Sequence, residues 1–243
     1  MPPSTRRAPS AEPRVPSAEH RARVYEKIRD LVVRGRLAPG ARLVEAQIVS
    51  RLCVSRTSVR AALQRLQHEG YIRGATSGTN TRVTVAALTS ADAVELFRMV
   101  AEIEGLAAES AAQVAGTPRR ALVAELTRVN SEYRRAAAGS RPDGDQLYTL
   151  DTQFHCLYVE AGAGPRLLAL HQAVKPQIER YVRIYQTILT EEIQTSVVEH
   201  SAIVAEIATG SGRGAQDAVR TNWRNAAARL RLVIDARGES GSW

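Results

Sequence analysis

Three polar side chains in the second half of the chain have the residue types and the spacing to bind a metal ion. Asp151 and His155 stand four residues apart, so on a helix they share one stripe with apolar neighbours such as Phe154. His200 lies in the middle of a separate apolar stripe, close to Ile203. A carboxylate that points the same way as apolar residues needs a partner, because an unpaired buried charge is costly.

The partner of Asp151 is either a metal ion or another side chain. A divalent ion would be bound by Asp151 and His155 from one helix and by His200 from another, since carboxylates and imidazoles are common ligands. Without an ion, Asp151 and a histidine would form a buried hydrogen-bonded pair, and a single helical histidine is more often structural than a ligand. The spacing of these residues leaves both interpretations open.

The elements that must position these residues are helices. Apolar residues recur at helical spacing from residue 90 onwards, and Gly and Pro interrupt the pattern. The expected helices are 90–115, 118–138, 144–161, 165–189, 192–209 and 213–236. Their apolar stripes must be buried against one another, which predicts an all-α antiparallel bundle over residues 88–238.

The first third of the chain has a different pattern. Residues 1–18 are rich in Pro, Ser, Ala and Arg, which predicts a disordered tail. A helix over 19–34, a short helix around Ile48, a helix from Ser55 to His68 and two short strands at 71–73 and 82–85 follow. This order is typical of a winged helix-turn-helix, here over 19–87. The expected fold class is therefore mainly α, with a winged helix-turn-helix followed by a helical bundle.

The helix that begins at Ser55 would be the recognition helix of this domain. Its first turn offers free backbone N–H groups that suit phosphate, and its arginines can reach guanine edges. The candidate DNA-contacting residues of this helix are Ser55, Arg56, Thr57, Ser58, Arg60 and Gln64. Gly78 and Thr79, at the tip between the two strands, could lie along the DNA backbone or in the minor groove.

The composition agrees with a nucleic-acid partner but is weak support on its own. The formal net charge is +8 and the isoelectric point is about 10.1, which suits a polyanion. Only two cysteines occur, Cys53 and Cys156, so a disulfide framework is not indicated and a reducing cytoplasm is expected. No apolar run is long enough for a signal peptide or a membrane span, and no membrane partner is expected.

Residues 24–85 resemble the N-terminal domain of the GntR family of bacterial regulators. The resemblance rests on four ordered stretches, which are VYEKI from Val24, GRLAPG from Gly35, RLVE from Arg42 and VSRTSVR from Val54. ALQRL from Ala62 and EGYI from Glu69 follow them. It implies DNA contacts for Ser55, Arg56, Thr57, Ser58 and Arg60, and Arg42 joins this set. Two departures are Ala46, where the family usually has Arg, and Cys53, where it usually has Gly.

Residues 90–236 resemble the FCD effector domain of the FadR-type branch, in the shorter, vanillate-regulator-like group. The resemblance rests on ELF from Glu95, IEGLAA from Ile103, DTQFH from Asp151 and EHSAI from Glu199. Many such domains bind a divalent metal through one Asp and three His, which implies Asp151, His155 and His200 as ligands. Asn222 stands where the fourth His is expected, and its amide oxygen is a poorer, harder ligand. Zinc, nickel or manganese would be the ion.

The expected function is that of a sequence-specific transcriptional regulator and not of an enzyme. A homodimer would bind double-stranded DNA at a palindromic operator, and a small organic acid would modulate this binding from the helical domain. One alternative is a helical-bundle metalloenzyme fused to a DNA-binding domain, but no second carboxylate accompanies Asp151 as a general base. The other is a non-specific architectural DNA binder, which would show no preference between operator and random DNA.

Overall fold

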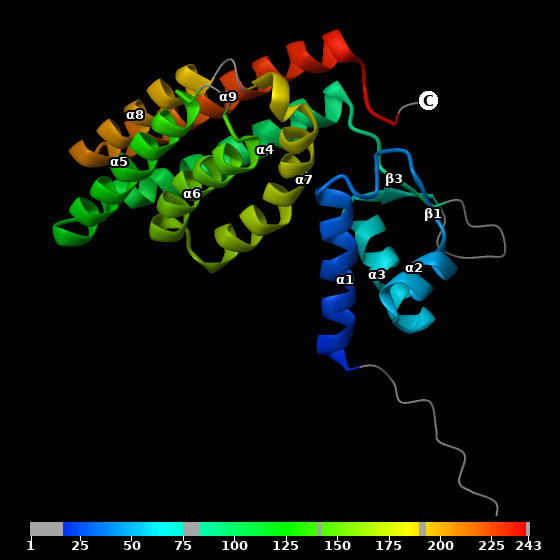
Figure 1. Cartoon of the computed structure of the whole chain (residues 1–243). Coiled ribbons are helices and arrows are strands. Elements are labelled where there is room, and N and C mark those ends of the chain that lie inside the picture. Colours follow the sequence, from blue (N-terminus) through cyan, green and yellow to red (C-terminus); the bar gives the residue numbers. More distant parts are fainter. Residues whose placement is uncertain (1–16, 75–82, 140–141, 190–192, 242–243) are drawn as a thin grey trace, which may run out of the picture.

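The computed structural model describes residues 17–74, 83–139, 142–189 and 193–241. It consists of a small N-terminal body and a larger helical body joined by a short linker (Figure 1). The predicted tail, apart from its last two residues, and the strand tip with Gly78 and Thr79 lie outside the described residues.

The N-terminal body contains three helices and a small antiparallel sheet. Its elements are α1 (Ala18–Val33), β1 (Arg42–Leu43), α2 (Glu45–Leu52), α3 (Arg56–His68), β2 (Ile72–Arg73) and β3 (Val83–Val85). The strand order is β1-β3-β2, and Thr84 pairs with Arg42 on one side and with Arg73 on the other. The predicted winged helix-turn-helix is therefore present, and β1 is an addition that the sequence pattern did not indicate.

Local residue chemistry explains the ends of these helices. The Ser55 hydroxyl accepts a hydrogen bond from the Ser58 N–H at 3.1 Å, which caps α3 as its position predicted. Gly40 has a φ of 76°, and the Ala41 N–H donates to the Ala38 carbonyl at 3.0 Å, which closes the predicted turn. Cys53 ends α2 in the left-handed region with a φ of 53°, where a glycine would fit without strain.

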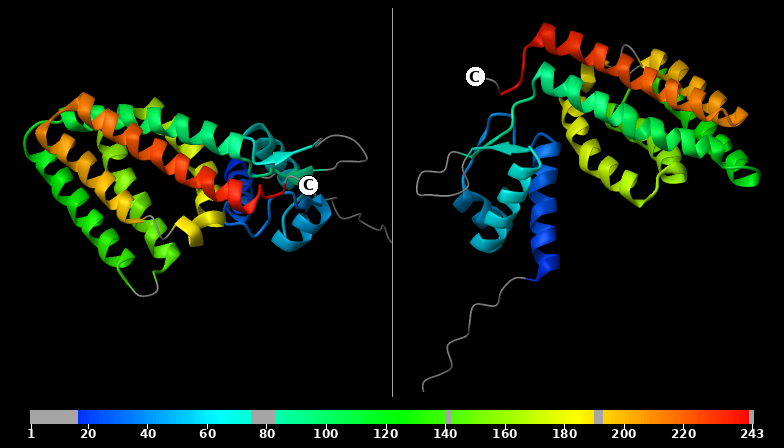
Figure 2. Two further views of the ribbon diagram at one scale, coloured as in Figure 1. Left: turned by 90° about the horizontal axis from the view of Figure 1, so that it is seen from above. Right: turned by 180° about the vertical axis from the view of Figure 1, so that it is seen from behind.

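The C-terminal body is a bundle of long helices. They are α4 (Ser90–Gln113), α5 (Thr117–Ala137), α6 (Gly144–Gly162), α7 (Pro165–Leu189), α8 (Ile193–Thr209) and α9 (Gly212–Arg237). Each helix begins and ends within two residues of its predicted bounds. Helices α4 and α9 run antiparallel along each other, so the end of α9 lies beside the start of α4 (Figure 2). The predicted fold class is confirmed.

Tight packing fixes how the helices of the bundle cross. A side chain at Gly162, the last residue of α6, would overlap the Ala107 carbonyl of α4, so only glycine allows this close approach. Apolar side chains from all six helices form one core, with Val100, Leu126 and Ile203 completely buried. None of the described helices has both the length and the apolar character needed to cross a membrane.

Candidate effector and metal site

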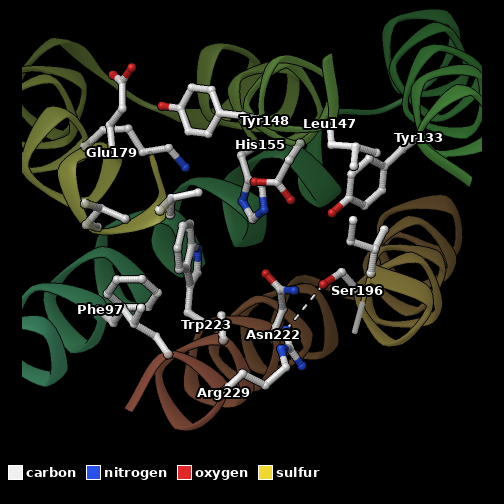
Figure 3. Close-up of a pocket in the computed structure, with 17 residues that line it drawn as sticks. Phe97, Tyr133, Leu147, Tyr148, His155, Glu179, Ser196, Asn222, Trp223 and Arg229 are labelled. Atoms are coloured by element: carbon white, nitrogen blue, oxygen red, sulfur yellow. Dashed lines mark hydrogen bonds between the residues drawn. The ribbon is translucent and has the colours of Figure 1, made fainter. Parts of the chain in front are cut away.

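A cavity of about 110 Å³ lies inside the helical body, and all six helices contribute to its wall. Figure 3 shows His155 of α6, Tyr133 of α5 and Asn222 of α9 pointing into this space from different helices. Most of the wall is apolar or aromatic, with Phe97 and Trp223 on one side. A concave, largely apolar cavity with a few polar groups is typical of a site for a small molecule.

Of the three residues singled out by their spacing, Asp151 and His155 line this cavity, and His200 lies next to them. One ligand atom from each of Asp151, His155 and His200 lies within 4.8 Å of the others. His200 is completely buried and His155 is 2% exposed, whereas the Asp151 side chain is 30% exposed. Asp151 Oδ1 lies 3.6 Å from His200 Nε2, which is longer than a hydrogen bond.

His200 is the residue that most clearly needs a further partner. Neither of its ring nitrogens has a hydrogen-bond partner within the described part of the chain, although both are buried. Its ring stacks on Phe154 with 4.0 Å between centroids. Burial, followed by the nearby His155 and Lys175, holds the pKa of His200 well below its usual range. A metal ion requires a neutral imidazole with a free lone pair, and an ion would give one of the two His200 nitrogens a partner, so the residues present fit such an ion.

His155 is oriented by a carboxylate behind it. Its Nδ1 lies 2.6 Å from Glu104 Oε2 and 2.6 Å from the Tyr158 hydroxyl. Because a carboxylate only accepts, Nδ1–H is the donor, and Nε2 keeps its lone pair for the cavity. A histidine ligand that donates its second ring N–H to a carboxylate is the usual arrangement in metal sites.

Glu104 is a completely buried carboxylate that collects five donors. Oε2 accepts from His155, Tyr158 and Trp223, and Oε1 accepts from His171 at 2.9 Å and Lys175 at 3.3 Å. Burial alone would raise the pKa of Glu104, but the charge of Lys175 and the bonds from the histidines hold it well below its usual range. We call Glu104 with these five residues the Glu104 hub. The sequence pattern was not used to identify Glu104, although an acidic residue among the apolar residues of 103–108 indicates a buried carboxylate that needs partners.

Asn222, the departure from the expected fourth histidine, lies at the same cavity and is 4% exposed. Its Nδ2 donates to Glu199 Oε2 at 2.9 Å. Glu199 also accepts from Asn225 and forms a bidentate pair with Arg229. Since Glu199 binds the amide nitrogen, the amide oxygen of Asn222 is the atom left to act as an acceptor or ligand.

The predicted DNA-contacting residues lie on one body, far along the chain from the cavity. Ser55, Arg56, Thr57, Arg60, Gln64 and Arg42 are all exposed. Arg60 pairs with Glu45 at 3.3 Å while its side chain stays 60% exposed. Ser58 differs from the expectation, because it is completely buried and its hydroxyl lies 2.9 Å from Ser55 Oγ. Its side chain completes the helix cap and does not face outward.

Two family descriptions match the chain, and together they cover both bodies. The model for the FCD domain matches residues 95–225, and the model described as bacterial regulatory proteins, gntR family, matches residues 20–80. The chain belongs to the GntR family and carries an FCD domain. Members of this family are transcriptional regulators and not enzymes, so this chain is a DNA-binding regulator with a C-terminal effector-binding domain.

Individual relatives agree with this assignment. An uncharacterized HTH-type transcriptional regulator of Bacillus subtilis, YdhC, is 22% identical over 89% of this chain and 93% of its own length. The Nta operon transcriptional regulator of Aminobacter aminovorans is 28% identical over 60% of this chain and 64% of its own length. The McbR/YncC structure from E. coli has the same fold, with a TM-score of 0.67 and 18% identity, and covers 90% of this chain and 98% of its own. FCD domains are commonly associated with metal ions, in keeping with the Asp151, His155 and His200 cluster.

Proposed function

We propose that this regulator binds a small organic acid in the cavity of its helical domain, with the help of a divalent metal ion, and that occupancy changes its affinity for an operator. The observation that carries the proposal is His200, whose two buried ring nitrogens lack partners in the described chain. A site built around such a residue is stabilised when a ligand satisfies it.

Asp151, His155, His200 and Asn222 would hold the ion. Two imidazoles, one carboxylate and one amide oxygen form a mixed nitrogen and oxygen set, which suits zinc, nickel or manganese. The replacement of a fourth imidazole by the Asn222 oxygen makes the set harder and weakens it toward zinc in particular. A bound ion would supply an open coordination position for a carboxylate oxygen of the effector.

The rest of the cavity supports a small acid with an apolar body. Lys175 lies at the wall with its ammonium 4.4 Å from the centre of the Trp223 ring, so a cation and an aromatic face are presented together. Tyr133 and Tyr148 line the other sides. Because Lys175 already pairs with Glu104, the carboxylate of the effector would be bound by the ion, and the rings suit an apolar or aromatic remainder.

At the other end of the molecule, the proposed DNA surface consists of exposed residues of one body. It contains Ser55, Arg56, Thr57, Arg60, Gln64 and Arg42. Gly78 and Thr79, which lie outside the described residues, complete the proposed set. Two copies of α3, brought together in a homodimer, would lie about one DNA turn apart on a palindromic operator. The buried Ser58 contributes to this surface only by holding the first turn of α3.

Elemental analysis of the purified protein tests the metal site. Near-stoichiometric zinc, nickel or manganese is expected in the wild type after incubation with each ion, and its loss is expected in Asp151→Ala/His200→Ala. The matched control is Asp217→Ala/His68→Ala, which removes the same residue types from exposed positions. Equal metal content in all three proteins, or none in any, would contradict the proposed ligand set. Thermal shift with a panel of small carboxylates on the loaded protein then tests the effector class.

A further inference from the structure

One helix, α7, contacts both the cavity and the winged domain. Lys175, Ile178 and Glu179 line the cavity. Between and beside them, Gln177, Arg180 and Tyr181 form hydrogen bonds to the N-terminal body or to the linker that follows it. Lys175 and Tyr181 are about 9 Å apart along the helix axis, at a rise of 1.5 Å per residue.

On the cavity side, α7 is bonded to the same carboxylate that orients a proposed metal ligand. His171 and Lys175 donate to Oε1 of Glu104, and His155 donates to its Oε2. All of these groups are buried, or nearly so, where hydrogen bonds to a charge are strong and a misplaced partner is costly. The Glu104 carboxylate therefore bonds to His155 at the cavity and to α7 at the same time.

On the winged-domain side, the contacts of α7 are directed at backbone atoms. Gln177 Nε2 donates to the Glu69 carbonyl at 2.9 Å, at the end of α3. Arg180, which is only 3% exposed, donates to the Ala86 carbonyl at 2.7 Å. The Tyr181 hydroxyl accepts from the Thr89 N–H at 3.1 Å. The backbone at the C-terminal end of α3 and the backbone of the linker are thus bonded directly to α7.

Pro176 stands between the two sets of contacts. It removes one backbone hydrogen bond from the middle of α7, and α7 changes direction along its length (Figure 1). Pro176 thus separates the segment with His171 and Lys175 from the segment that carries Gln177 and Arg180.

The end of the chain provides a second attachment from the cavity wall. After α9, which contributes Asn222 and Trp223 to the cavity, the Glu239 carboxylate accepts from the Ser90 N–H at 2.9 Å. Ser240 then pairs with Leu88 of the linker. Gly241 packs on the turn at Gly40, where an added side-chain carbon would lie 3.0 Å from the Gly241 Cα. The linker is thus held by α7 and by the segment that follows α9.

We propose that α7 transmits the state of the cavity to the DNA-reading body, from the Glu104 hub through Gln177, Arg180 and Tyr181, with residues 239–241 as the second attachment. This inference rests on the proposed function, in which occupancy of the cavity alters operator binding. It adds the structural route between the cavity and the winged domain. It requires that the protein with an occupied cavity and the protein with an empty cavity differ in the position of α7.

Hydrogen–deuterium exchange of the full chain tests the route without an identified effector. Lys175→Met removes one bond of the Glu104 hub and leaves the contacts to the winged domain in place. Amides in 69–73 and 86–92 are expected to exchange at least about fivefold faster, because the loss of one hydrogen bond accounts for that factor and the buried Glu104 charge left without its cation adds to it. Arg166→Met, which removes a positive charge from an exposed position of the same helix, leaves them unchanged. Faster exchange confined to 103–107 in Lys175→Met would overturn the inference.

Zinc alone provides an independent perturbation of the folded wild type. Zinc is expected to slow exchange in 69–73 and 86–92, because an ion at His155 fixes the hub. Gln177→Ala, which removes the contact to Glu69, abolishes the slowing in 69–73 only, and Gln172→Ala, at an exposed position of α7, retains it in both segments. Zinc that binds without changing exchange in 86–92 would overturn the route. A wild type that binds no zinc would instead refute the metal site of the proposed function, and the Lys175→Met comparison would then decide the inference by itself.

Discussion

Glu104→Gln is expected to be among the most destabilising near-isosteric changes in the helical domain. Glu104 has no exposed surface, and five donors point at it. Glutamine keeps the shape but removes the charge, so Lys175, whose side chain is 12% exposed, loses its carboxylate. The amide also places a donor where donors already converge. Breaking a buried, hydrogen-bonded charge pair in this way costs about 3–5 kcal/mol of unfolding free energy.

Urea unfolding measures this cost directly. With a slope of about 2–3 kcal/mol/M, the midpoint falls by about 1–2.5 M. Trp223, whose Nε1 donates to Glu104 at 2.8 Å, reports on the hub by fluorescence once Trp243→Phe has removed the second of the two tryptophans. Glu102→Gln on the same helix is the control. The Glu102 side chain is 59% exposed, and its pair with Arg220 contributes at most about 1 kcal/mol. Equal midpoints for the two variants would refute the reasoning about the buried carboxylate.

Three further changes have defined outcomes. Asn222→His completes a set of three imidazoles and should raise zinc affinity by at least about tenfold in a competition with a fluorescent chelator; unchanged affinity would place Asn222 outside the ligand set. Arg56→Ala or Arg60→Ala should weaken binding to a selected operator by about 1–3 kcal/mol without altering thermal unfolding, since both side chains are exposed. Unchanged operator affinity would remove α3 from the recognition surface. Cys53→Gly should stabilise the winged domain by about 1 kcal/mol in a thermal melt, because Cys53 has a φ of 53°; a lower melting temperature would show that its side chain matters more than its backbone.

The helices could be predicted from the sequence because their boundaries are set locally. Thr117-Pro118 begins one helix, and the glycines at 162, 210 and 212 separate others, so caps and breaks coincide with the ends of the apolar stripes. Asp151, His155 and His200 were predicted for a similar reason. Each is a polar residue inside an apolar stripe, and such a residue is detectable without knowledge of what lies opposite.

What could not be predicted depends on contacts between distant segments. Strand β1 has only two residues, and pairing with Val83 and Thr84 defines it, so no local pattern indicates it. The five donors of Glu104 come from three other helices, and spacing within one helix cannot reveal such a convergence. Ser58 has the position in the sequence of a DNA-contacting residue, but its hydroxyl forms a hydrogen bond with the Ser55 hydroxyl at the start of α3.

The Glu104 hub contributes to the stability of the helical domain, to the proposed metal site and to the connection between the two domains. Glu104 fixes the His155 ring, so the lone pair that a metal ion would use depends on a carboxylate behind it. The same carboxylate holds α7 through Lys175, and α7 holds the backbone at Ala86 through Arg180. A substitution in the hub should therefore weaken metal binding and loosen the linker together. A substitution at Arg56, which touches neither the cavity nor the linker, should leave metal binding and the linker unchanged. This contrast separates DNA recognition from effector binding.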